Sequence, residues 1–389
     1  MLNLSHRGQL SLFGVVAGLL TLPLNGRDNQ FPQEKLSYER YIAVDNACGW
    51  PLLTCLPSGK IALLVWPAPN HGLTEGAVEC WISADDGRHW TKTGIPVPNV
   101  PKESRLNHAG GVTPGGDLLV LVGGAGNKHP QGWTPSPSDP PRPKSQSGPP
   151  LLDPIPAISR DEGRTWQRYG KISGSGRLPG ISNIPFGQIA SVGDGTLGAM
   201  LYDYNEVNGD CRDYFFVTQD NGATWTKRSQ LSQERNANES TWIRLKNGDL
   251  YAAARGGGDE HIDGYRSSDH GASWTYEQAL TLPQQHPGSL ATLPDGRILL
   301  TYGVRNPGRW AIDARIGDPT AHTWTAPILV ADLAGSTDGQ GPPSPVRDGG
   351  YPSSVVLHDG TILTAYYCRG IPTHRRYHVG VVRWQPPAD

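Results

Sequence analysis

Polar and aromatic residues recur at one equivalent position in six short repeats of this chain. Each repeat has a turn glycine between two apolar runs, and the position lies nine residues before that glycine. Equivalent positions of a repeat occupy equivalent places in a fold, so these side chains should gather on one face. Polar groups that open apolar strands indicate a ligand pocket rather than a core. The six residues are Trp50, Asn107, Phe186, Glu239, Pro287 and Tyr351, with His108, Gln188 and His286 within two positions.

Six predicted β-hairpins must position these residues. In each, an apolar run meets a turn with glycine, often Asn-Gly or Asp-Gly, and resumes as a second apolar run, which is a strong short-range hairpin signal. The turn glycines fall 57, 79, 53, 48 and 64 residues apart, which suits four strands per repeat. The hairpins span Leu52–Leu64, Gly110–Val120, Ile189–Gly198, Thr241–Tyr251, Ser289–Leu300 and Ser353–Leu363.

A second repeat follows the pattern Ser/Thr-x-Asp-x-Gly-x-x-Trp. The aspartate can accept hydrogen bonds from turn amides, the glycine supplies a left-handed backbone, and the tryptophan packs against the strands. We therefore interpret Asp85, Asp161, Asp220 and Asp269 as structural rather than metal-binding. The copies are Ser83–Trp90, Ser159–Trp166, Thr218–Trp225 and Ser267–Trp274, with a degraded fifth at Gly317–Trp324.

This second repeat resembles the Asp box of the sialidase (neuraminidase) superfamily. The resemblance implies an all-β fold, a six-bladed β-propeller, with each hairpin as the inner strands of a blade and each Asp box as an outer turn. We expect one propeller over residues 36–389, closed by pairing of Tyr38–Val44 with His378–Trp384. Residues 126–152 are too rich in proline for a strand or helix and read as an insertion in the second blade.

The resemblance also implies roles for several residues. A sialidase nucleophile is a tyrosine before Ser-Ser in the last inner hairpin, and Tyr351-Pro-Ser-Ser matches it. The glutamate that activates this tyrosine corresponds to Glu239. Two arginines that bind the substrate carboxylate correspond to Arg255 and Arg309, with Arg305 as the alternative to Arg309.

The chemistry of a tyrosine–glutamate pair agrees with these roles. A neutral phenol has a pKa of about 10 and is a poor nucleophile at pH 7. A carboxylate within hydrogen-bond reach can take its proton during attack, so we expect the side chains of Tyr351 and Glu239 to meet. Sialidases with a tyrosine nucleophile are an exception to the usual pair of carboxylates.

Two departures from the sialidase pattern alter the expected substrate. The first arginine of the carboxylate clamp is replaced by Gly49, and the loop 66–79 contains no aspartate to act as acid/base. In that loop His71 or Glu75 can shuttle a proton. We therefore expect a terminal sugar, acidic but other than ordinary sialic acid, to be bound. Its binding residues are expected to include Arg255, Arg309, Trp50, Asn107, His108, Gln188 and His286.

Composition narrows the class of partner. The chain has 389 residues and a formal net charge of −2, so it has no basic footprint for nucleic acid and no polybasic membrane patch. A glycan or oligosaccharide partner fits this composition, and the pattern predicts neither a cofactor nor a metal. The five cysteines show no C-x-x-C pair; pairing of Cys48 with Cys55 is open, and small buried hydrophobic residues are favoured.

The N-terminus resembles a secretory signal. His6 and Arg7 precede an apolar run from Leu10 to Leu24, which is too short to span a membrane. We predict a signal peptide over residues 1–26 and a secreted or periplasmic protein without stable membrane insertion.

Three functions remain open from the sequence. The leading one is a secreted, sialidase-like retaining exo-glycosidase. The second is a hydrolase or lyase for a uronic-acid, rhamnose or arabinose glycan that uses Glu239 with His108 or His286. The third is a glycan-binding propeller without catalysis, in which Trp50, Phe186 and Tyr351 stack on sugar rings.

Overall fold

The structure is a computed structural model that describes residues 38–126, 128–132, 151–173, 184–204, 210–257, 260–307, 309–333, 348–371 and 374–387. All the helices and strands assigned within these ranges are strands, and none is a helix. None of the described residues forms a helix with the length and hydropathy that a bilayer crossing requires. The predicted signal peptide at residues 1–26 and residues 133–150 of the proline-rich insertion lie outside the described ranges.

Each predicted hairpin is present and is extended by two further strands into an antiparallel run of four. Four such runs are separate sheets. They are β2 (Leu52–Cys55), β3 (Ile61–Val65), β5 (Glu79–Ser83) and β6 (Thr91–Gly94); β17 (Ala237–Arg244), β18 (Leu250–Gly256), β19 (Ile262–Ser267) and β20 (Thr275–Ala279); β21 (Gln285–Thr292), β22 (Ile298–Asn306), β23 (Arg309–Gly317) and β24 (Ile328–Asp332); and β25 (Gly349–Val356), β26 (Ile362–Ile371), β27 (His374–Trp384) and β1 (Tyr38–Asp45).

The second and third runs are joined into one sheet, which differs from the expected separate blades. They comprise β8 (His108–Val112), β9 (Leu118–Ala125), β10 (Leu151–Ser159) and β11 (Gln167–Arg168), then β13 (Ile184–Ser191), β14 (Leu197–Tyr204), β15 (Cys211–Thr218) and β16 (Thr224–Gln230). Strands β8 and β13 pair in parallel. Gly111 makes this approach possible, because a Cβ there would lie 1.9 Å from the carbonyl oxygen of Ile189. The short strands β4 (Gly76–Ala77), β7 (Ser104–Arg105) and β12 (Lys171–Ser173) flank this sheet.

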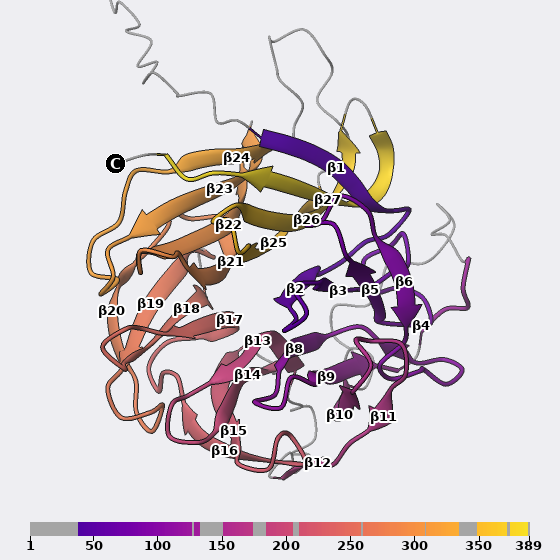
Figure 1. Cartoon of the computed structure of the whole chain (residues 1–389), viewed down its shortest axis with the longest axis horizontal. Helices are drawn as coiled ribbons and strands as arrows, with labels where there is room; N and C mark the ends of the chain where they lie inside the picture. Colours follow the sequence, from indigo (N-terminus) through magenta and orange to yellow (C-terminus); the bar gives the residue numbers. More distant parts are fainter. Residues whose placement is uncertain are drawn as a thin grey trace, which may run out of the picture. The chain divides into compact units, whose positions relative to one another are not determined.

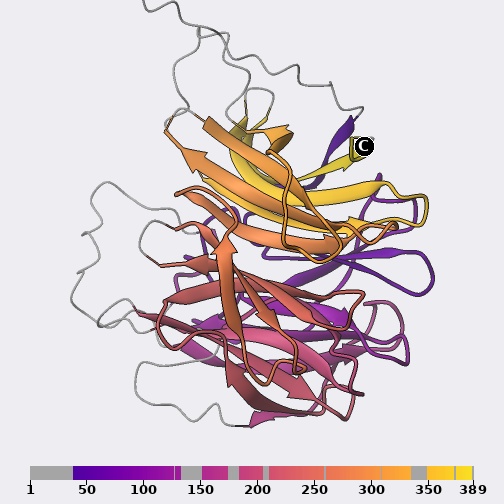
Figure 2. The same cartoon turned by 90° about the vertical axis from the view of Figure 1, so that its left-hand side faces the viewer.

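The innermost strands form a closed ring. Each of β2, β8, β13, β17, β21 and β25 contacts the next, and β25 contacts β2 (Figure 1). The view turned by 90° shows neighbouring sheets stacked face to face (Figure 2). This is the arrangement of a β-propeller. The expected closure is confirmed, because β1 pairs with β27 from Tyr38 opposite Trp384 to Asp45 opposite His378.

The Ser/Thr-x-Asp-x-Gly-x-x-Trp repeats form turns between the two outer strands of their four-strand runs, as expected. In the second copy, Ser159 donates to Asp161 at 2.9 Å, Asp161 accepts the Thr165 amide at 2.8 Å, and Trp166 donates to the Gly163 carbonyl at 2.9 Å. The aspartate oxygens are thus occupied by bonds within the turn. Apolar side chains between adjacent sheets, including the fully buried Trp225 and Trp242, form the core.

Candidate active site

Left-handed backbone marks three of the six equivalent positions. Trp50, Glu239 and Tyr351 have φ of 52°, 47° and 51°. The strand pairing shifts register at the same places, between Asn238 and Thr241 and between Gly350 and Ser353. A non-glycine residue held in this conformation costs about 1–3 kcal/mol and persists where the surroundings impose it, often at functional sites. The bulges therefore re-aim Glu239 and Tyr351 relative to the rest of their strands.

Tyr351 and Glu239 meet as the sequence predicted, although they lie on strands β25 and β17. The Tyr351 hydroxyl donates to Glu239 Oε1 at 2.6 Å. The second oxygen, Oε2, accepts from Arg255 Nη1 at 2.8 Å. Tyr351 and Glu239 are both buried. The arrangement can therefore pass a proton from the phenol to a carboxylate that an arginine keeps in position.

Burial controls the charge of the nucleophile candidate. Desolvation first, and then the Glu239 carboxylate, raise the pKa of Tyr351 well above its ordinary value. Burial alone would lower the pKa of Arg255, but the adjacent Glu239 reverses this, and that pKa also lies above its ordinary value. At neutral pH the phenol is therefore protonated and the guanidinium is charged.

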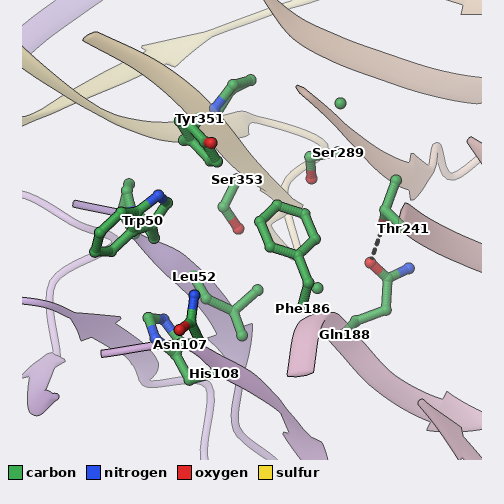
Figure 3. Close-up of a pocket in the computed structure, with 14 residues that line it drawn as sticks. Trp50, Leu52, Asn107, His108, Phe186, Gln188, Thr241, Ser289, Tyr351 and Ser353 are labelled. Atoms are coloured by element: carbon green, nitrogen blue, oxygen red, sulfur yellow. Dashed lines mark hydrogen bonds between the residues drawn. The ribbon is translucent and has the colours of Figure 1, made fainter. Parts of the chain in front are cut away.

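Aromatic rings and one guanidinium surround the phenol. Trp50 and Phe186 meet Tyr351 edge-on, with ring centroids 6.2 and 6.1 Å away. Arg305 lies over the Tyr351 ring at 5.2 Å, and its Nε donates to the Gly349 carbonyl at 3.2 Å. Figure 3 shows the rings of Trp50, Phe186 and Tyr351 among the residues that line a pocket. These rings offer flat apolar surface of the kind on which sugars stack.

His71 also contacts Trp50 and is paired with an aspartate. Its ring centroid is 5.1 Å from that of Trp50, and its Nδ1 is 3.4 Å from Asp348 Oδ2. Asp348 also accepts from the hydroxyls of Tyr367 at 2.8 Å and Tyr377 at 2.6 Å. Burial alone would raise the pKa of Asp348, but bonds from His71, Tyr377 and Tyr367 lower it to about 2. A permanently charged carboxylate thus orients a half-exposed imidazole.

One group of donors in the described chain could hold a metal ion. Ligand atoms of Cys48, His71 and Asp348 lie within 4.8 Å of one another. Burial, followed by the nearby Asp348 carboxylate, raises the pKa of the Cys48 thiol well above its ordinary value. Because a thiol binds metal as the thiolate, and Asp348 already accepts two tyrosine hydroxyls, this set fits a metal ion poorly.

Two cavities adjoin the site. A small one of about 30 Å³ lies at the propeller axis, with lining residues that include Trp50, Asn107, His108, Phe186, Gln188 and Tyr351. A larger cleft of about 1150 Å³ is lined by residues that include His71, Glu75, Arg369, Arg376 and Tyr377. The small cavity has room for about one water molecule, whereas the cleft has the size of an oligosaccharide site. His71 lines the cleft and contacts Trp50, which lines the small cavity.

Of the other predicted binding residues, His108 and His286 are buried, and Asn107 and Gln188 are half-buried. His108 is buried and its Nδ1 donates to the Leu106 carbonyl at 3.2 Å. Gln188 Oε1 accepts from Thr241 at 2.6 Å. His286 is buried with Nε2 3.0 Å from Glu260 Oε2. Asn107, His108 and Gln188 line the small cavity, whereas His286 is not among its lining residues.

Two predicted residues lie apart from the phenol. Arg309 Nη2 donates to both carboxylate oxygens of Asp313, at 2.8 and 2.7 Å, because Arg309 belongs to β23 rather than to the loop before it. The alternative arginine, Arg305, is the one beside Tyr351. The Glu75 carboxylate accepts the Lys102 amide at 2.6 Å, at the edge of the larger cleft.

Two acidic residues that pair with predicted site residues were not singled out from the sequence, Asp348 with His71 and Glu260 with Arg255, and Arg305 was placed second. Asp348 lies three positions before Tyr351, and Glu260 five positions after Arg255, each in a glycine-rich context. The signal in the sequence that could have identified Asp348 and Glu260 is an acidic residue a few positions from a predicted site residue. Arg305 was named only as an alternative to Arg309.

The model of the BNR repeat-like domain family matches residues 126–364, which is more than half of the chain. The chain belongs to the BNR repeat-like domain family. No curated protein matches it significantly. The BNR repeat chain is structurally similar to a protein of unknown function from Dyadobacter fermentans, with 21% identity, a TM-score of 0.68, and coverage of 90% of this chain and 98% of that one.

Two characterised proteins share this propeller fold. One is a Trypanosoma rangeli sialidase in complex with sialic acid, with 17% identity, a TM-score of 0.58, and coverage of 88% of this chain and 55% of that one. The other is a Penicillium chrysogenum α-L-arabinanase complexed with arabinobiose, with 15% identity, a TM-score of 0.58, and coverage of 88% and 98%. The BNR repeat chain thus has the sialidase-like propeller fold of glycosidases with different substrates.

The backbone and surroundings of Gly49 disfavour any side chain at this position. Gly49 has φ of 112°, and a Cβ would lie 3.2 Å from Trp66 Cδ1. We predict that Gly49→Ala lowers the free energy of unfolding by about 1–3 kcal/mol, measured by urea denaturation. Gly49→Arg should lower the free energy of unfolding by a similar amount, and it should not restore a carboxylate clamp. Gly115→Ala, at an exposed glycine whose Cβ has room, should change it by less than about 0.5 kcal/mol.

Buried His108 should make stability depend on pH. Burial lowers its pKa to about 4, below the unfolded value of about 6.5. Between these values the unfolded chain takes up a proton that the folded chain does not, so stability falls as the pH falls, by about 1.4 kcal/mol per pH unit. Buried Asp213, whose pKa burial raises to about 7, contributes in the opposite direction, so the comparison must be between variants.

We therefore predict that the His108→Gln protein takes up about one proton fewer on unfolding than the parent protein does between pH 4.5 and 6. The measurement is the slope of unfolding free energy against pH for both proteins. His358→Gln, at an exposed histidine of the last inner turn, should leave the slope unchanged. Identical slopes for His108→Gln and the parent protein would show that His108 is protonated alike in both states.

Proposed function

We propose that the protein is a retaining exo-glycosidase that releases a terminal sugar from a glycan. The observation that carries this proposal is the buried 2.6 Å bond from the Tyr351 hydroxyl to Glu239 Oε1. A site that only binds sugar needs a ring to stack on, but has no use for a phenol whose proton already points at a carboxylate. The propeller fold shared with glycosidases supports the proposal.

In the first step Tyr351 Oη attacks the anomeric carbon as its proton passes to Glu239. The bond from the anomeric carbon to the leaving oxygen breaks, and His71 protonates that oxygen. In the second step His71 takes a proton from water, which attacks the anomeric carbon. The bond to Tyr351 then breaks and the phenolate recovers its proton from Glu239. Two inversions at one carbon retain its configuration.

The position of His71 supports its role as acid/base. It lies between Trp50, which contacts Tyr351, and the larger cleft. A glycan bound with its terminal sugar over Tyr351 would extend into this cleft, so its leaving oxygen would pass His71. Asp348, paired with Nδ1, orients the ring and stabilises the imidazolium, as a carboxylate does for histidine in a hydrolase triad.

A hydrolase or lyase based on Glu239 with His108 or His286 is less well supported. His108 is buried on a backbone carbonyl and His286 on Glu260, whereas Glu239 is bonded to Tyr351. A screen of aryl glycosides in both anomeric forms, with sialic, glucuronic, galacturonic, rhamnose and arabinose sugars, tests the proposal. Release of the aryl group with net retention by NMR is expected; inversion or an unsaturated product would contradict it.

We also propose that the protein is exported, on the basis of the apolar run that follows His6 and Arg7. The intact mass of protein recovered outside the cytoplasm tests this. Loss of about the first 26 residues is expected, and retention of the full chain in the cytoplasm would contradict it.

A further inference from the structure

The guanidinium expected to bind a substrate carboxylate already holds two carboxylates of the protein. Arg255 Nη1 donates to Glu239 Oε2 at 2.8 Å, and Nη2 lies 2.5 Å from Glu260 Oε1. The first contact prepares the proton acceptor of Tyr351. The second uses the side of Arg255 that a ligand would otherwise approach.

Glu260 is held at both oxygens in the way that a ligand carboxylate would be. Its second oxygen, Oε2, lies 3.0 Å from His286 Nε2. Burial, followed by the charges of Arg255 and Arg305, lowers the pKa of His286 to about 2. His286 is thus neutral at pH 7, and its Nε2–H donates to Glu260. The Glu260 side chain is itself 46% exposed, so it lies at the boundary between this pair of donors and solvent.

The charges around Tyr351 leave no excess of positive charge for an anion. Arg255 and Arg305 supply two positive charges, and Glu239 and Glu260, which both pair with Arg255, supply two negative ones. Tyr351 and His286 are neutral. The Arg305 Nε donates to the Gly349 carbonyl, so it is not free for a ligand. Gly49 has no side chain that could bind a ligand carboxylate. A carboxylate entering this pocket would meet Glu260 at close range, where like charges repel strongly.

We propose that Glu260 is a specificity residue that occupies the carboxylate clamp, so that the sugar bound over Tyr351 carries no carboxylate and offers hydroxyl groups to Glu260 instead. The inference rests on the proposed function for the location of the sugar. It replaces the expectation of an acidic sugar by a neutral one, because hydroxyls donate well to a carboxylate.

The test compares matched pairs of methyl glycosides that differ only in a carboxylate at C6: glucoside with glucuronide, galactoside with galacturonide, each in both anomeric forms, together with a methyl sialoside and neutral rhamnoside and arabinofuranoside. Binding is measured by calorimetry on the Tyr351→Phe protein, which keeps the ring and prevents turnover. The neutral sugar that binds best should bind at least about tenfold more tightly than any acid.

The decisive comparison adds Glu260→Gln, which keeps the size and removes the charge. The ratio of neutral to acidic affinity should fall by about tenfold or more, since the repulsion between the Glu260 charge and a ligand carboxylate would be removed. Glu234→Gln, at an exposed glutamate outside the pocket, should leave the ratio unchanged. Equal or tighter binding of an acid to the Glu260-containing protein, an unchanged ratio in Glu260→Gln, or no binding of any neutral sugar would each overturn the proposal. Neutral binding without hydrolysis by the Tyr351-containing protein would instead contradict the proposed function alone.

Discussion

Tyr351→Phe should abolish hydrolysis while sparing sugar binding. The substitution keeps the ring that packs against Trp50 and Phe186 and removes the oxygen that attacks the anomeric carbon. We expect kcat to fall by at least about 10³-fold, as for loss of a nucleophile in other hydrolases. The dissociation constant of the substrate should change by less than about threefold, because the lost hydroxyl faces Glu239.

The measurement is steady-state kinetics with the best aryl glycoside, together with calorimetric binding. Tyr302→Phe, at a buried tyrosine of β22 outside the site, is the matched control and should keep the parental kcat. Turnover of Tyr351→Phe within about tenfold of the parent would contradict a tyrosine nucleophile and favour a carboxylate or histidine mechanism.

Glu239→Gln should have the second largest effect. The amide keeps the shape of the side chain and can still accept from Tyr351, but it cannot take the phenol proton as the bond to the sugar forms. Loss of a general base typically costs about 10²–10⁴-fold, and we expect a fall in kcat of this size. Arg255 should remain in place through its second contact with Glu260.

Glu277→Gln is the control for this second prediction, because Glu277 pairs with Arg266 at 2.5 Å in a region away from Tyr351. It should leave kcat unchanged. If Glu239→Gln retained parental kcat, the bond between Glu239 and Tyr351 would be a structural contact, and the proton would leave by another route.

The sequence predicted the strands and the residues that open them well. Hairpins are local, and a turn glycine between apolar runs fixes both strands. Counting back from that glycine identified Trp50, Glu239 and Tyr351, and all three have left-handed backbone in the structure. For Glu239 and Tyr351 the count succeeded because their two hairpins keep the same length from the turn glycine to the bulge. It could not show that β8 and β13 pair, since this depends on the close approach at Gly111.

The charged residues of the site were harder to predict. Arg305 and Arg309 lie four positions apart, and only the pairing of β22 with β23 shows that Arg309 faces Asp313. Glu260 and Asp348 lie in loops, where no periodicity relates a residue to the axis of the propeller. Asp348 contacts His71, which is distant in sequence. Glu260 contacts Arg255 from a loop outside the repeats. Only the structure could therefore place these two residues.

Covalent trapping tests the central claim most directly, namely that Tyr351 bonds to the sugar during the reaction. In a 2-deoxy-2-fluoro glycosyl fluoride of the sugar that is turned over, fluorine at C2 slows both steps because it destabilises the positively charged transition state. Fluoride leaves readily from C1 as Tyr351 bonds to it, so the intermediate forms faster than it breaks down. The account predicts that the intact mass rises by one fluoroglycosyl group, that peptide mass spectrometry places it on Tyr351, and that Tyr351→Phe stays unlabelled. Labelling of a carboxylate or histidine, or equal labelling of Tyr351→Phe, would contradict the account.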